Sequence, residues 1–146
     1  MNKEILAREK FIWDDLIADG KKMIDMVREM WRKDRKIPRM MFSWPSEHLE
    51  SIEGKIVTHI VSFAVPKELN TFEAAVGMTK ATKAYALLLV EQEESDVRIL
   101  LESFHGTRCW RLPIRRHGDI DVLEKENASE DTESLGILWR RSVGQS

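Results

Sequence analysis

Residues 97–119 read VRILLESFHGTRCWRLPIRRHGD, and this stretch decides the architecture of the C-terminal half of the chain. Two His-Gly pairs, His105-Gly106 and His117-Gly118, lie twelve residues apart and separate segments rich in strand-forming residues. A tight antiparallel meander has this spacing: strand, two-residue turn, strand, turn, strand. Histidine is enriched among residues with positive φ, so each histidine is interpreted as a turn residue beside its glycine.

The strands on either side of these turns extend the predicted meander over residues 84–141. Individual strands are predicted at 84–91, 97–104, 107–114, 119–124 and 135–140, with an acidic loop over 125–134. The first two of these strands are apolar on both faces, which is typical of central strands in a sheet covered on both sides. In the third strand, Trp110 and Leu112 are predicted to point toward the core.

The N-terminal half predicts a long amphipathic helix over residues 3–34, within a helical segment of residues 1–37. Apolar residues recur there at helical spacing, and Gly20 in the middle marks either a kink or a break. Asn70 predicts the start of a second, shorter helix over 70–83. Between the helices we expect an apolar loop at 39–45, a short helix at 46–53 and a buried strand at 55–65.

These elements together predict one α+β domain spanning residues 1–146. Both helices are expected on one face of a mostly antiparallel sheet of five or six strands that ends in the C-terminal meander. Strands with two apolar faces leave the other face of such a sheet in need of a cover. A second copy of the same chain is the simplest cover, so we expect a homodimer.

Composition limits the classes of function that this chain can have. Of its 146 residues, 42% are hydrophobic and 33% charged, and the formal net charge is -2. This indicates a folded soluble protein and excludes a strongly basic domain. The N-terminus carries too many acidic groups for a signal peptide, and the longest uncharged run, residues 56–65, is too short to cross a bilayer. The single cysteine fits a reducing compartment, so we expect a cytoplasmic protein without a membrane partner.

The four histidines do not have the spacing of a metal site. In the predicted meander, His105 and His117 lie at opposite ends of one strand, about 30 Å apart at ~3.3 Å per residue. To bind one zinc ion together, both histidines would need a ring nitrogen within ~2.1 Å of the metal. His48 and His59 are eleven residues apart and match no zinc pattern. We therefore expect neither a metal nor another cofactor.

The sequence contains no recognisable catalytic set. Cys109 lies in a predicted strand next to Trp110, where a cysteine is more often a small buried hydrophobic residue than a nucleophile. Asp119 and Asp121 alternate with apolar residues and project from one face of a predicted strand, so they could hold a metal or share a proton. The interpretation as the charged face of an edge strand is favoured over that chemistry.

Arg28, Arg32 and Arg35 belong to the strongest cluster of basic residues, which spans residues 28–39. They lie at neighbouring helical positions close to Trp31, and basic side chains beside an aromatic ring could bind the phosphate backbone of a nucleic acid. Cations are equally favourable near a helix C-terminus, and the net charge of -2 argues against a nucleic-acid partner. Nucleic-acid binding is therefore an alternative that the sequence does not favour.

The function that the sequence favours is interaction: a small regulatory or interaction protein that binds another macromolecule. Trp44, next to Pro45 in the predicted apolar loop, is expected at a surface or an interface, because tryptophan is enriched at binding hot spots. The alternative is a small enzyme or ligand-binding domain. Its site would lie between the meander and residues 39–48, with four candidate residues: Arg111, Asp119, Asp121 and Cys109.

Overall fold

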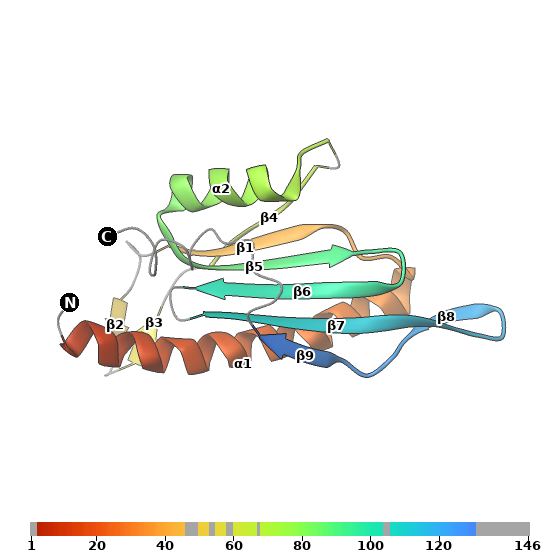
Figure 1. The fold of residues 1–146 in the computed structure, drawn as a ribbon, viewed down its shortest axis with the longest axis horizontal. Coiled ribbons are helices and arrows are strands. Elements are labelled where there is room, and N and C mark those ends of the chain that lie inside the picture. Colours follow the sequence, from red (N-terminus) through yellow and green to blue (C-terminus); the bar gives the residue numbers. More distant parts are fainter. Residues whose placement is uncertain are drawn as a thin grey trace.

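The computed structural model describes residues 3–45, 50–52, 55–57, 60–66, 68–103 and 106–130 (Figure 1). The chain is an α+β protein, as predicted, with a long N-terminal helix, a second short helix and a curled antiparallel sheet. In chain order the elements are α1 (Lys3–Asp34), β1 (Met40–Pro45), β2 (Glu50–Ile52), β3 (Lys55–Val57), β4 (Val61–Ala64), α2 (Thr71–Thr82), β5 (Ala84–Gln92), β6 (Asp96–Ser103), β7 (Gly106–His117), β8 (Ile120–Leu123) and β9 (Asn127–Glu130).

The main sheet has the strand order β4-β1-β5-β6-β7-β8, and β9 pairs with β7 beside β8. All of these pairings are antiparallel. The predicted meander is confirmed for β5, β6 and β7, where Leu88 lies opposite Leu101 and Ile99 opposite Trp110. A separate two-stranded sheet pairs β2 with β3. The chain therefore inserts β1 and β4 on the outer side of β5, so that β4 forms one edge of the main sheet.

The sheet is apolar on both faces, and a different helix covers each face. Along β5, Leu88 and Val90 pack into a core with the buried stripe of α1, whereas Leu87 and Leu89 pack into a second core with α2. Figure 1 shows the two helices on opposite sides of the sheet. The expectation that both helices cover one face is therefore wrong. A sheet with two apolar faces needs an element packed on each of them. Each large side chain left in water on an uncovered face would forgo ~1.5–3 kcal/mol of burial free energy.

The predicted apolar loop at 39–45 is instead strand β1, which lies between β4 and β5. Met40, Phe42 and Trp44 pack against the α1 core, while Met41 belongs to the α2 core. Because both faces are largely apolar, the stretch lacks the polar alternation that marks a half-exposed strand. Pro45 at its end is also typical of a loop, and the pairing with β5 shifts register there.

Short strands replace two other predicted elements. Residues 50–52 of the predicted short helix form β2, while 46–49 and 53 lie outside the described residues. The single buried strand predicted at 55–65 is instead two short strands in different sheets, β3 and β4, and Ser62 and Ala64 of β4 are exposed. Part of the predicted acidic loop, residues 127–130, is strand β9. The predicted strand at 135–140 lies outside the described residues.

The second turn of the meander uses different residues from those predicted. His117 is the last residue of β7 and pairs with Ile120, so the two-residue loop is Gly118-Asp119. Gly118 has φ 64 and Asp119 has no positive φ, as in hairpin turns with glycine in their first position. His117 itself has no positive φ, so its interpretation as a left-handed turn residue is wrong. His105 of the first turn lies outside the described residues.

Helix α2 begins as the sequence predicts. The Asn70 side-chain oxygen accepts hydrogen bonds from the backbone N–H groups of Phe72 and Glu73, at 2.8 and 3.3 Å. These bonds satisfy two donors that the first turn of a helix leaves without partners. Ala75 is buried in the core between α2 and the sheet. Phe72, in the first turn of the helix, is exposed.

Helix α1 is continuous through Gly20, which marks neither a kink nor a break. Gly20 is buried in the stripe that faces the sheet, between Leu16 and Ile24. A Cβ atom at this position would lie 2.5 Å from Cη2 of Trp110. The glycine is therefore required by the close approach of the Trp110 ring from β7, which is itself buried in the core.

Replacing Gly20 by alanine should destabilise the protein. The added methyl group overlaps a buried indole ring, and overpacking of this kind costs ~1–3 kcal/mol, more than the ~1 kcal/mol that alanine gains in helix propensity. Gly77 in α2 is the matched control, because a Cβ there meets nothing within 4 Å. Urea denaturation of both variants checks this. Gly77→Ala should raise the free energy of unfolding, and a similar rise for Gly20→Ala would contradict the packing explanation.

Candidate functional site

The basic residue Arg28 holds a corner of the sheet instead of facing a partner. Its guanidinium donates to the backbone carbonyls of Leu123 and Glu124 at 3.3 and 2.9 Å and pairs with the Glu126 carboxylate at 2.8 Å. The contacted residues connect β8 to β9 along the same edge of β7. Arg28 therefore joins the C-terminal part of α1 to a segment almost one hundred positions later in the chain.

The local geometry explains why an arginine is needed at this corner. Ile114 pairs with Leu123 and Arg111 pairs with Asn127, so residues 112–113 of β7 face the longer segment 124–126. The extra residue interrupts the ladder as a β-bulge does, next to the backbone carbonyls of Leu123 and Glu124. The forked donors of Arg28 satisfy two of these carbonyls, which would otherwise be partly buried without a partner.

Trp31 of α1 and Arg35, which directly follows the helix, continue this contact toward the β7–β8 hairpin. Trp31 Nε1 and Arg35 Nη1 both donate to the backbone carbonyl of Asp121, at 3.0 and 2.9 Å. Arg28 and Trp31 lie three positions apart in one stripe of α1, and Arg35 follows just beyond the end of the helix with a positive φ of 53. Arg32 lies off this stripe and pairs with Glu29 on the exposed side at 2.6 Å. The structure thus brings Arg28, Arg35 and Asp121 together as an internal lock, which we call the α1–hairpin lock.

The lock has an electrostatic signature at Glu126. The pKa of this carboxyl is lowered from its ordinary value of 4.5, chiefly by a hydrogen bond to its own backbone N–H and next by the hydrogen bond from Arg28. Both bonds favour the charged carboxylate over the neutral acid. The ionised form of Glu126 is therefore the one that the folded corner stabilises.

Arg111, a candidate for the ligand-binding alternative, lies in a row of charges across the α2 face of the sheet. It pairs with Asp96 and Glu93, at 3.0 Å each. Arg98, directly opposite Arg111 on β6, pairs with Glu91 at 3.0 Å. The two opposed arginines would repel each other without the intervening carboxylates. Arg111 is therefore part of an ion-pair network that closes the β5–β6 hairpin.

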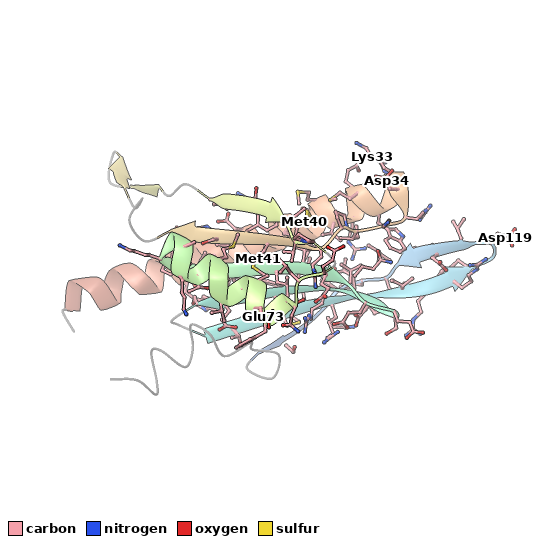
Figure 2. The ribbon with its side chains drawn as sticks, turned by 90° about the horizontal axis from the view of Figure 1, so that it is seen from above. Lys33, Asp34, Met40, Met41, Glu73 and Asp119 are labelled. Carbon is pink, nitrogen blue, oxygen red and sulfur yellow. The ribbon has the colours of Figure 1, made fainter. Side chains whose placement is uncertain are left out.

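The other residues of the ligand-binding alternative do not converge. Cys109 is buried in the α2 core, where it packs as a small hydrophobic side chain. Asp119 lies in the tip of the β7–β8 hairpin, which extends beyond the rest of the sheet in Figure 2. Asp121 is in β8, and its carboxylate lies 3.6 Å from Arg116. The predicted pair of carboxylates on one strand face is therefore not formed, since only Asp121 is in a strand.

Trp44, expected at a surface, is only 2% exposed. It forms the floor of an apolar groove of about 370 Å³ that lies between α1 and the strands β1 and β4. The walls of this groove, here called the α1–β4 groove, come from Met23, Met26, Phe42, Ile60, Ser62 and Leu88, with Asp19 and Lys22 on the rim. Met26 and Ile60 are exposed to 39% and 47%, which is high for side chains of this size.

Partial burial in the groove affects the pKa of the Asp19 carboxyl. Its pKa is raised from 3.8, mainly because partial burial removes water from the carboxylate, while Lys22 acts in the opposite direction and Asp15 adds to the rise. A carboxylate in this setting would gain from a nearby cation of a binding partner. The groove therefore combines exposed apolar side chains with one acidic and one basic group at its rim.

The groove runs along an open edge of the sheet. Within the residues that the structure describes, β4 pairs with β1 alone, so its other edge offers backbone N–H and C=O groups to a further strand. Sequence reasoning pointed to Trp44 but not to Met26, Ile60 or Ser62. The available signal was Met26, an apolar residue placed beside the main stripe of α1.

A second, larger groove of about 870 Å³ lies where α1 ends, beside the ends of β4 and β5. Its charged lining includes the acidic residues Asp34, Glu91 and Glu93 and the basic residues Arg35, Lys36 and Arg39. Arg39 already donates to Thr71 at 2.9 Å and to the backbone carbonyls of Pro66 and Leu69. With both signs equally represented, this groove does not select for a phosphate or another anion.

The described residues contain no cluster of three or more histidine, cysteine or acidic side chains that could hold a metal ion. Across the same residues, no helix has the length and apolar character needed to cross a membrane. Comparison with protein-family models, curated proteins and solved structures gives no match. The α1–β4 groove with its open edge is therefore the candidate site that the geometry supplies.

Replacing Arg28 by methionine should destabilise the protein by about 1–3 kcal/mol, because it leaves two partly buried carbonyls without their charged donor. Arg32→Met is the matched control on the same helix, since the Arg32 side chain is exposed and contacts only a neighbouring exposed carboxylate. Urea denaturation of both variants measures the difference. Equal effects of the two substitutions would contradict the assignment of Arg28 to the lock.

Stability should depend on Glu126 in a defined pH window. Because its pKa is lower in the folded protein than the ordinary 4.5, its ionisation stabilises the fold above that value, and this contribution is lost as pH falls below it. The difference in unfolding free energy between wild type and Glu126→Gln should therefore be constant from pH 7 to about 5.5 and shrink below ~4.5. The same substitution in an Arg28→Met background should show a weaker pH dependence, and a difference that grows in acid would contradict the assignment.

Proposed function

We propose that the protein acts by binding another protein chain at the α1–β4 groove. The observation that carries this proposal is the coincidence, at the same strand, of an exposed apolar groove with a sheet edge that has no partner strand among the described residues. Neither feature alone indicates a binding site, because single exposed apolar residues are common and every open sheet has edges. Together they match the pattern in which an extended segment adds to a sheet and inserts side chains into pockets beside it.

The chemistry of the groove favours a protein segment over a small polar ligand. Met26 and Ile60 supply apolar surface, and water leaves that surface at ~25 cal/mol per Å² when it is covered. The edge of β4 supplies regularly spaced donors and acceptors, which suit a polypeptide backbone. Methionine also adapts its shape to different partners, so Met23 and Met26 fit a surface that accepts side chains.

Our proposal assigns the interaction function expected from the sequence to this groove, with contact residues other than the expected Trp44. Trp44 contributes a rigid floor under the groove, and the exposed residues Met26 and Ile60 are the proposed contacts. Arg28 and Arg35 do not take part, because their side chains are engaged in the α1–hairpin lock. No observation in the described residues favours the enzyme alternative, whose candidate residues lie on separate parts of the sheet.

Replacing Met26 by aspartate should abolish partner binding, because it puts a charge into the apolar groove next to Asp19. Ile120→Asp is the matched control: Ile120 is 51% exposed, but it lies at the tip of the β7–β8 hairpin away from the groove. Intact cells that express each form are treated with an amine-reactive crosslinker, and the adducts are identified by mass spectrometry. We expect a protein adduct in wild type and Ile120→Asp that is lost in Met26→Asp. Absence of any wild-type adduct, or its survival in Met26→Asp, would overturn the proposal.

A further inference from the structure

We infer that the strand received by this edge is β4 of a second copy of the same chain, paired antiparallel about a two-fold axis through Ser62. The inference rests on the proposed function and names its partner. A symmetric pairing presents the same strand and the same groove from both copies, so the interface is self-complementary. The main sheet then continues from one protomer into the other.

The direction of the backbone groups in β4 supports this pairing. The backbone N–H of Val65 donates to the carbonyl of Arg39 at 2.9 Å, and Ala64 and Ser62 lie opposite Met40 and Phe42. Residues of an antiparallel strand alternate between those bonded to one neighbour and those directed away from it. Val65 faces β1, so the N–H and C=O groups of Ser62 and Ala64 point to the open edge.

These outward groups fix the register of a symmetric pair. Directly opposed residues of an antiparallel pair point to the same face of the sheet, and they exchange both hydrogen bonds when both face the gap. Ser62 then lies opposite the partner's Ser62, and Ile60 lies opposite the partner's Ala64. The small Ser and Ala side chains leave room for close approach, and the pairing covers Ile60, which is 47% exposed in the single chain.

The charges at the groove rim agree with a partner of the same sequence. Each rim carries Asp19 and Lys22, one residue of each sign, next to an apolar interior. A surface of a single sign would repel its own copy, whereas a surface with both signs can satisfy itself across a two-fold axis. Partial burial already disfavours the ionised form of Asp19, so a lysine from the partner would stabilise it.

A single cysteine at the proposed axis tests this register. In Ser62→Cys the two new thiols lie across a hydrogen-bonded pair, where Cα atoms are ~5.5 Å apart, within the range that a disulfide or a short thiol crosslinker bridges. Ala64→Cys is the matched control, because the partner's Ile60 lies opposite it instead of a second cysteine. Wild type controls for Cys109, the chain's own cysteine, which is buried.

Native mass spectrometry of the purified full chain first establishes whether a dimer is present. Mild oxidation and dibromobimane labelling of the three forms then follow. We expect a dimer, with a shift from monomer to covalent dimer in Ser62→Cys and none in Ala64→Cys or wild type.

A dimer that Ser62→Cys does not crosslink, or that Ala64→Cys crosslinks equally, would overturn the β4 pairing and leave the proposed function standing. A monomer that keeps a Met26-dependent adduct to a different protein would overturn the second copy as partner. A monomer without any such adduct would overturn both.

Discussion

Strands β5 and β6 carry large apolar side chains on both faces, and the rest of the structure is arranged to cover them. Alternate residues of β5 belong to two separate cores, one closed by α1 and the other by α2. Strands β1 and β7 also have two apolar faces. Met40 of β1 and Trp110 of β7 pack into the α1 core, whereas Met41 of β1 and Cys109 of β7 pack into the α2 core. A helix on each side is the smallest set of elements that removes all this surface from water.

The charged residues are organised around these two cores. On the α1 side, Arg28 and Arg35 bind backbone carbonyls near the β7–β8 hairpin and secure a corner where the strand ladder is interrupted. On the α2 side, Arg98 and Arg111 alternate with carboxylates across three strands. Arg28, Arg35 and Arg111, which the sequence suggests as ligand contacts, thus form contacts that stabilise the edges of the sheet. The α1–β4 groove differs because it leaves two large apolar side chains, Met26 and Ile60, exposed.

Periodicity and turn residues were sufficient to predict α1, α2 and the β5–β6–β7 meander, because each carries its own local signal. Strand β9 was missed because Asn127 and Ser129 have little strand propensity, and its formation depends on the edge that β7 leaves free. Gly20 was misread because its role depends on the Trp110 ring, which arrives from ninety positions later in the chain. The lock was missed for the same reason: the acceptors of Arg28 are backbone carbonyls, and a sequence pattern does not encode where carbonyls point.

The order of α1 and the meander along the chain has a consequence for biosynthesis. Its buried stripe faces strands from the last half of the sequence, and Arg28 meets Glu126 across 98 positions. During translation at ~5–20 residues per second, the helix leaves the ribosome roughly 5–20 s before its corner of the sheet exists. Throughout that interval Leu16, Ile24, Val27 and Trp31 have no native strands from the meander to cover them. The apolar stripe of α1 therefore stays without its native cover during this part of synthesis, and contacts between such distant segments predict slow folding.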